Sequence, residues 1–160
     1  MTDKRKNNRL AEFDYSTVGA YFITVCVKGK QHIFWAKNVG ADIIRPQNEY
    51  ILSDYGYIAD RVIKDIPVHY PSITVDKYAI MPNHIHLLLS IHETDGRIIS
   101  APTISTVVGQ MKRQISKLIG ISIWQKSFYD HIIRNKHDYD AAWQYIDENP
   151  VKWETDEFYN

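Results

Sequence analysis

Hydrophobic segments in this chain alternate between the period of a β-strand and the period of an α-helix, and they do so in one definite order. Four segments rich in β-branched and aromatic residues predict strands, which run from Tyr21 to Val27, Ile73 to Met81, His84 to Ile91 and Phe128 to Arg134. Apolar residues at helical spacing predict three helices, of which one runs from Asp54 to Pro67, one through Val108 and Met111 to Gly120, and one from about Lys136 to Asn149. A small hairpin between His32 and Ile44 and a loop between Glu93 and Pro102 complete the expected elements.

The resulting order is β-α-β-β-α-β followed by a terminal helix, which predicts an α+β fold. This is the ferredoxin-like arrangement, in which an antiparallel sheet carries two helices on one face. The chain has 160 residues and contains no internal repeat or Gly/Ser-rich linker. We therefore expect residues 1–160 to form a single domain.

Composition is typical of a soluble globular protein, with 44% hydrophobic and 24% charged residues. The single cysteine, Cys26, excludes an internal disulfide and fits a reducing cytoplasm. No apolar run is long enough to span a bilayer, and the charged start from Met1 to Lys6 is followed by no apolar stretch of a signal peptide. These features predict a cytoplasmic protein with no membrane partner.

Charges balance overall, with 19 basic and 19 acidic side chains, but they are unevenly distributed. Basic side chains gather in two segments, and a locally basic surface on a neutral protein can still hold a phosphate backbone. The two groups are Lys4, Arg5, Lys6 and Arg9 near the amino terminus, and Lys112, Arg113, Lys117, Lys126 and Arg134 further along. Charge clusters are also common on solvated surfaces. From Asp138 onward acidic residues dominate.

Two histidines open an otherwise apolar predicted strand. His84 and His86 are two residues apart, so both imidazoles project from the same face of the sheet while Ile85 points into the core. Imidazole is the commonest neutral metal ligand, and two at this spacing can hold one cation. Two half-exposed strand histidines with no ligand remain an alternative interpretation. The His-x-His-x-His pattern of histidine-triad nucleotide hydrolases is excluded because the third position is Leu88.

The terminal helix carries a second candidate pair. Tyr145 and Asn149 are four residues apart, so they share one helix face and can converge on one site. The Asn149 amide oxygen could complete a metal site begun by the histidines. Tyr145 could act as a nucleophile, because tyrosine is among the side chains that form covalent intermediates. A tyrosine at the core edge and an asparagine at a helix end remain the structural alternatives.

Three segments, read together, are distinctive. They are YAIMPNHIHL at 78–87, IWQKSFYDHIIR at 123–134 and YIDENP at 145–150. The chain closely resembles the single-tyrosine HUH transposases of the insertion-sequence-200 type, and most of all their REP-associated branch. The resemblance extends from about Phe13 to Pro150, which is nearly the whole chain.

The resemblance implies a nuclease domain that cleaves and rejoins single-stranded DNA at hairpin ends through a 5′-phosphotyrosine intermediate. It assigns His84 and His86 as metal ligands, Asn149 as the third ligand and Tyr145 as the nucleophile. The implied cofactor is Mg²⁺ or Mn²⁺, the implied partner is single-stranded or hairpin DNA, and the implied location is nucleoid-associated. A homodimer stays open, as does whether the tyrosine helix serves its own site or a neighbour's.

Three rival interpretations keep parts of this assignment. One is a domesticated hairpin-binding protein with little or no strand transfer, and one is a phosphodiesterase that activates water and uses Tyr145 structurally. The third is a ferredoxin-like binder of a small metabolite. In the DNA-binding interpretations, Trp35 and Trp124 are candidates to stack unpaired bases, or are core residues.

Overall fold

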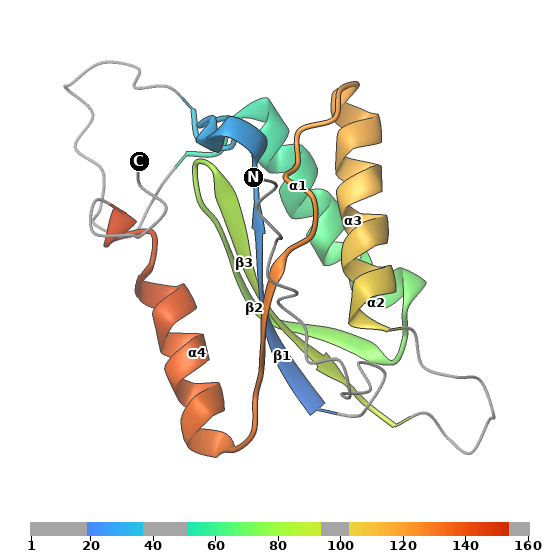
Figure 1. Ribbon diagram of the computed structural model, residues 1–160, viewed down its shortest axis with the longest axis vertical. Coiled ribbons are helices and arrows are strands. Elements are labelled where there is room, and N and C mark those ends of the chain that lie inside the picture. The colour runs from blue at the N-terminus through green and yellow to red at the C-terminus, as the bar shows by residue number, and fades with distance from the viewer. Residues whose placement is uncertain (1–18, 37–50, 94–102, 154–160) are drawn as a thin grey trace, which may run out of the picture.

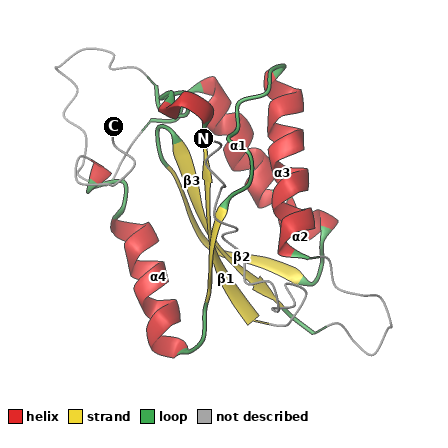
Figure 2. Ribbon diagram, in the orientation of Figure 1, coloured by secondary structure: helices red, strands yellow, loops and turns green. Residues whose placement is uncertain are grey.

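The computed structural model describes residues 19–36, 51–93 and 103–153. Its strands are β1 (Gly19–Cys26), β2 (Ile73–Ile80), β3 (His84–Ile91) and β4 (Tyr129–Ile132), and its helices are α1 (Asp54–Lys64), α2 (Ile66–His69), α3 (Ile104–Ile119) and α4 (Lys136–Glu148). A 3₁₀ turn, η1 (Lys28–Lys30), follows β1. The predicted α+β class is confirmed (Figures 1 and 2).

The four strands form one antiparallel sheet in the order β2-β3-β1-β4. The helix expected to end at Pro67 ends at Lys64 instead, and Pro67 lies in the first turn of α2, where its missing N–H is not needed. The last strand is shorter than expected, because it pairs with β1 only from Tyr129 to Ile132. Most of the expected hairpin at His32–Ile44 and of the expected loop at Glu93–Pro102 lies outside the described residues.

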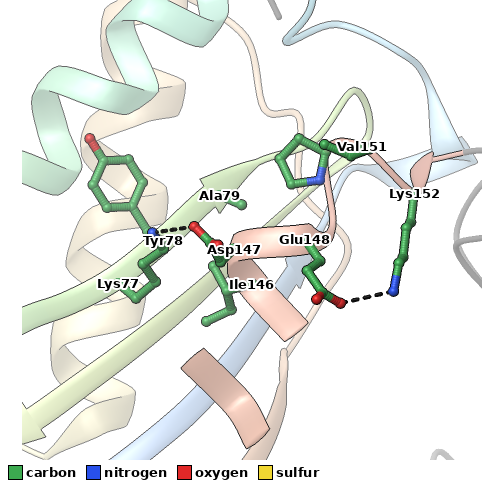
Figure 3. Close-up of a pocket in the computed structure, with 9 residues that line it drawn as sticks. Lys77, Tyr78, Ala79, Ile146, Asp147, Glu148, Val151 and Lys152 are labelled. Carbon is green, nitrogen blue, oxygen red and sulfur yellow. Dashed lines mark hydrogen bonds and ion pairs between the residues drawn. The ribbon is translucent and has the colours of Figure 1, made fainter. Parts of the chain in front are cut away.

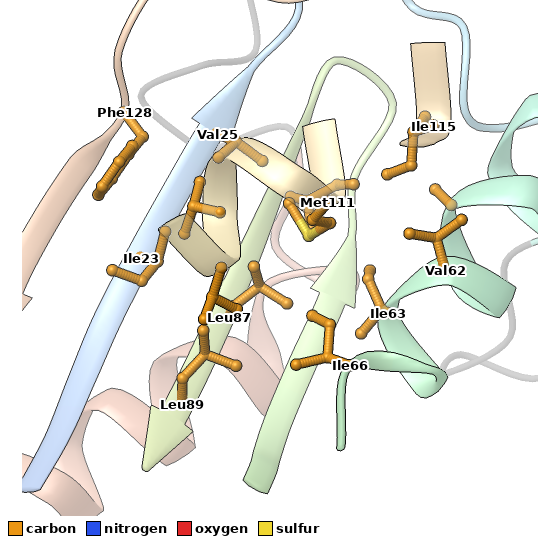
Figure 4. Packing of buried hydrophobic residues seen from close by; sticks show 14 of the residues in the cluster. Ile23, Val25, Val62, Ile63, Ile66, Leu87, Leu89, Met111, Ile115 and Phe128 are labelled. Carbon is orange, nitrogen blue, oxygen red and sulfur yellow. The ribbon is translucent and has the colours of Figure 1, made fainter. Parts of the chain in front are cut away.

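The two faces of the sheet are covered by different helices. Alternate residues of β3, among them Ile85, Leu87 and Leu89, belong to the main core, which α1 and α3 close from one side (Figure 4). The intervening residue Leu88 joins a smaller cluster with Ile146 of α4 on the opposite face. The strand is thus buried on both faces, which explains why it lacks the polar alternation of a half-exposed strand. The α1 and α3 helices lie on one side of the sheet and α4 on the other (Figure 1).

The helix ends follow their sequence signals. Gly120 ends α3 in the left-handed conformation, with φ of 96°, as expected for a glycine C-cap. Asn135 caps α4 by accepting a hydrogen bond of 2.8 Å from the backbone of Asp138. No helix in the described ranges is long and apolar enough to cross a membrane.

Leu87→Ala is expected to lower the free energy of unfolding by about 2–5 kcal/mol, because Leu87 is fully buried in the main core and its truncation leaves a cavity. Urea denaturation of the full chain measures the change. The matched control is Leu118→Ala on α3, where the side chain is half exposed, and it is expected to change the unfolding free energy by less than about 1 kcal/mol. Equal losses in both variants would contradict the assignment of Leu87 to the core.

Candidate active site

His84 and His86 project from β3 toward each other on the face that α4 covers. Their side chains are buried, which rules out the half-exposed alternative. The two Nε2 atoms lie 3.0 Å apart, and the ring centroids are 4.6 Å apart. Two imidazole nitrogens this close can share one proton or one cation.

The outer nitrogen of each imidazole has its own hydrogen-bond partner. His84 Nδ1 lies 2.6 Å from the Asn83 amide oxygen, which can only accept, so the imidazole carries its proton on Nδ1 and a lone pair on Nε2. His86 Nδ1 lies 2.8 Å from Thr24 Oγ1 on β1, and a proton donated to this hydroxyl leaves the His86 Nε2 lone pair facing that of His84. A hydrogen bond to the outer ring nitrogen, like these two, fixes the orientation of a metal-binding histidine.

The α4 helix brings Tyr145 to the histidine pair. The Tyr145 ring meets the His86 ring edge-on, with centroids 5.3 Å apart, and meets Phe22 in the same way at 5.8 Å. Phe22 in turn stacks on His86 at 5.4 Å. The Tyr145 side chain is 41% exposed, so its ring is fixed by aromatic neighbours while a ligand can still reach it from solvent.

Asn149 follows at the end of α4 and is buried. Its Oδ1 atom accepts no hydrogen bond from any residue in the described ranges. Trp153, four residues further along the chain, contacts His84, with 5.8 Å between the ring centroids. The segment from Tyr145 to Trp153 therefore contacts His86 at its start and His84 at its end. Buried amide oxygens normally accept a hydrogen bond or bind a cation, and a hard cation binds such an oxygen well.

Two groups of contacts hold α4 against β2. The Tyr139 hydroxyl donates a hydrogen bond of 2.8 Å to Asp76, and burial together with this bond raises the pKa of Tyr139 to about 12. Lys77 pairs with Asp147 at 2.8 Å and lies 4.2 Å above the Trp143 ring. The helix that carries Tyr145 is therefore anchored, at both ends, to the sheet of its own chain.

Tyr139→Phe is expected to lower the free energy of unfolding by about 1–3 kcal/mol, since it removes a donor to the Asp76 carboxylate while keeping the ring. Chemical denaturation measures this loss. Tyr57→Phe, on the exposed surface of α1, serves as the control and should be neutral. An unchanged stability in Tyr139→Phe would show that this bond does not anchor α4.

Each acidic residue of α4 has a basic side chain as its partner. The pairs are Asp138 with His131, Asp140 with Lys136, Asp147 with Lys77, and Glu148 with Lys152. The hydrogen bond from His131 is the main cause that holds the pKa of Asp138 below its usual range. The acidic residues of α4 therefore present less negative charge to a ligand than the sequence of this helix indicates.

A pocket of about 430 Å³ lies beside the end of α4 (Figure 3). The Lys77–Asp147 and Lys152–Glu148 pairs are drawn there as dashed lines. Its lining residues are Lys77, Tyr78, Ala79, Ile146, Asp147, Glu148, Pro150, Val151 and Lys152. Ala79 is the β2 partner of His86 in the sheet, so the pocket adjoins the histidine pair.

The predicted DNA contacts are scattered. Lys4, Arg5, Lys6 and Arg9 lie outside the described residues. Lys112, Arg113 and Lys117 lie on α3, on the opposite side of the sheet from the histidines. Lys112 also holds the chain before β4, donating to the carbonyls of Gln125 and Ser127. Lys126 and Arg134 are exposed just before and just after β4.

The two tryptophans expected to stack bases are half-buried and packed against the main core. The indole N–H of Trp35 donates to the Ile80 carbonyl at 2.7 Å, and that of Trp124 donates to the Lys112 carbonyl at 3.0 Å. These contacts favour the core interpretation for both. Tyr129, to which no sequence pattern assigns a role, lies on β4 with its side chain 49% exposed.

Comparison with known proteins relates this chain to DNA transposases. No family model matches the chain. A Haemophilus influenzae protein of unassigned function is 30% identical over 175 residues, covering 97% of this chain and 93% of that protein. A second H. influenzae protein, named as a candidate REP-associated tyrosine transposase, is 29% identical over 87% of this chain and 74% of its own length.

Two further matches carry the same name. The REP-associated tyrosine transposase of Escherichia coli K12 is 32% identical over 79 residues, which is 49% of this chain and 44% of that protein. A solved REP-associated tyrosine transposase bound to a REP hairpin shares the fold, with a TM-score of 0.60 at 23% identity over 90% of this chain and 73% of that one. The chain belongs to the REP-associated tyrosine transposase family.

Proposed function

We propose that this chain is a single-tyrosine HUH transposase that cleaves and rejoins single-stranded DNA at hairpin ends. The observation that carries the proposal is the contact of Tyr145 with His86, whose Nε2 lies 3.0 Å from that of His84. A candidate nucleophile and a candidate metal-binding pair thus meet within one chain. The same proposal treats the sheet with α1 and α3 as a ferredoxin-like nuclease core, to which α4 adds the nucleophile.

The proposed substrate is DNA with a hairpin. A protein of the same fold is described as bound to a REP hairpin. In the chain itself, the exposed Tyr145 and the cations Lys126 and Arg134 lie on parts that solvent reaches. Cations hold the phosphate backbone, whereas the exposed tyrosine meets the scissile bond.

The residues around the histidines fit a divalent cation, Mg²⁺ or Mn²⁺, as cofactor. His84 and His86 would offer their Nε2 lone pairs and Asn149 its buried Oδ1, which accepts no hydrogen bond from the described residues. Imidazole ligands favour a transition ion such as Mn²⁺ over Mg²⁺. When bound, such an ion withdraws charge from a phosphate and holds it for in-line attack.

Tyr145 carries the covalent step in this proposal. Its Oη attacks the scissile phosphorus, a new O–P bond forms, and the bond from phosphorus to the 3′-oxygen breaks. The phenol loses its proton and the leaving 3′-oxygen gains one, which yields a 5′-phosphotyrosine and a free 3′-hydroxyl. The phosphotyrosine retains the energy of the phosphodiester, so a different 3′-hydroxyl can displace the tyrosine and rejoin the strand. Phe22 and His86 orient the tyrosine ring.

A labelling experiment tests the proposal. The full chain is incubated with Mn²⁺ and a single-stranded hairpin labelled at its 5′ or its 3′ end, and the products are separated on a denaturing protein gel. We expect a covalent adduct that carries only the 3′-side fragment. Cleavage without an adduct would instead favour activation of water, and tight hairpin binding without cleavage would favour a domesticated binding protein.

A further inference from the structure

The sheet face that carries the histidines continues across β1 onto β4. Cross-strand partners in an antiparallel sheet point to the same face. Ala79 is paired with His86, His86 with Thr24, and Thr24 with Tyr129, so these residues form one row across all four strands. Tyr129 therefore projects from the same face as His86. Sequence spacing does not predict this, because the two residues lie on different strands.

The packing of β4 supports this orientation. Phe128 belongs to the main core on the α1 and α3 side, and Ile132 packs against that core. Ile133 instead packs against the cluster on the α4 side. Tyr129 is an even number of residues from Ile133, so it shares that face. Two strand spacings of about 4.8 Å place the Cα of Tyr129 about 10 Å from that of His86.

The β4 end of this face is open to solvent. The α4 helix packs on β2 and β3, while Tyr129 is 49% exposed and His131, two residues further on, is exposed as well. Tyr129 thus presents a solvent-exposed aromatic surface beside the histidine pair, in the same row of the sheet as His86.

The charges around β4 suit a phosphate backbone. Lys126 precedes the strand and Arg134 follows it, and both are exposed. The nearby acids Asp138 and Asp140 are paired with His131 and Lys136. A second polypeptide strand is a poorer occupant of this edge, because β4 has only four residues and charged residues flank it.

We propose that Tyr129 stacks on the unpaired base next to the scissile phosphate, and that Arg134 contacts the backbone of the same single-stranded segment. This inference rests on the proposed function, because it names the part of the substrate that lies beside Tyr145. Base stacking on an aromatic side chain tolerates any base, since each has a π-face. Tyr129 thus supplies affinity for unpaired DNA and leaves sequence choice to other contacts.

The test uses the Tyr145→Phe variant of the whole chain, which is expected to bind DNA without cutting it, and measures affinity for two hairpins. One carries an unpaired oligothymidine flank and the other is blunt. Adding Tyr129→Ala is expected to weaken binding of the flanked hairpin about tenfold and leave the blunt hairpin unchanged. Tyr129→Phe should bind as the parent does. Tyr57→Ala on α1 is the matched control for loss of an exposed tyrosine.

A second measurement locates the contact. With 5-iodouracil placed along the flank, ultraviolet crosslinking should join one position to the peptide that contains Tyr129. Arg134→Gln should reduce the salt dependence of binding to the flanked hairpin by about one unit of slope, whereas Tyr129→Ala should leave that slope unchanged.

The outcomes separate this inference from the proposed function. Equal affinity of the Tyr129→Ala and Tyr57→Ala proteins for the flanked hairpin would overturn the stacking role and leave the proposed function standing. An equal loss on flanked and blunt hairpins would overturn it too, because the contact would not be to unpaired bases. A parent protein that binds neither hairpin would overturn the proposed function, and the stacking role with it.

Discussion

Tyr145→Phe is expected to abolish both the covalent adduct and strand cleavage, to below about one thousandth of the wild-type rate. The substitution removes only the phenolic oxygen. The ring keeps its edge-on contacts with His86 and Phe22, so the fold and hairpin affinity should be unchanged. Single-turnover cleavage of a labelled hairpin in Mn²⁺ measures the loss, and circular dichroism verifies that the variant is folded.

The control is Tyr57→Phe, which removes the hydroxyl of an exposed tyrosine on α1, on the other side of the sheet. It is expected to cleave at the wild-type rate. Cleavage that survives Tyr145→Phe would show that water or another side chain attacks the phosphate. In that case the water-activating phosphodiesterase would replace the tyrosine mechanism.

His86→Ala is expected to weaken Mn²⁺ binding at least about a hundredfold, because it removes one of the two Nε2 atoms that would bind the metal. His84→Ala should do the same, and Asn149→Ala should have a smaller effect, since one amide oxygen is lost. Calorimetric titration of the protein with Mn²⁺ in the absence of DNA measures the affinity directly and does not depend on catalysis.

His69→Ala on α2 serves as the control for a lost imidazole, because His69 is exposed and lies on the α1 side of the sheet. Its Mn²⁺ affinity should match that of the wild type. If His86→Ala and His69→Ala bind Mn²⁺ equally well, the histidine pair is not the metal site. The 3.0 Å approach of the two rings would then reflect a shared proton.

Local patterns in the sequence predicted much of the fold. The strand from His84 to Ile91, the start of α1 at Asp54 and the end of α3 at Gly120 follow from periodicity and capping, which depend on neighbouring residues. The side of the sheet that α4 covers does not follow from such patterns. It depends on contacts with β2, such as Tyr139 with Asp76, between residues far apart in the sequence.

The candidate site was predictable to the same extent. His84 and His86 follow from strand spacing, and Tyr145 with Asn149 from helix spacing. Thr24, which bonds to His86, lies 62 residues away in the sequence, and only strand register brings it there. Register also determines the position of Tyr129. Cationic side chains are the least predictable, because spacing cannot distinguish a lysine that contacts DNA from one, such as Lys112, that holds a loop.

In the proposed reaction, Tyr145 becomes covalently joined to DNA beside a metal held by His84 and His86. The most direct measurement is mass spectrometry of the protein after reaction with a hairpin substrate, nuclease trimming and proteolysis. We expect a nucleotide attached through a 5′-phosphate to the peptide that contains Tyr145, and no adduct in protein whose metal has been chelated. A nucleotide attached to any other residue, or cleaved DNA with no attached nucleotide, would contradict this reaction.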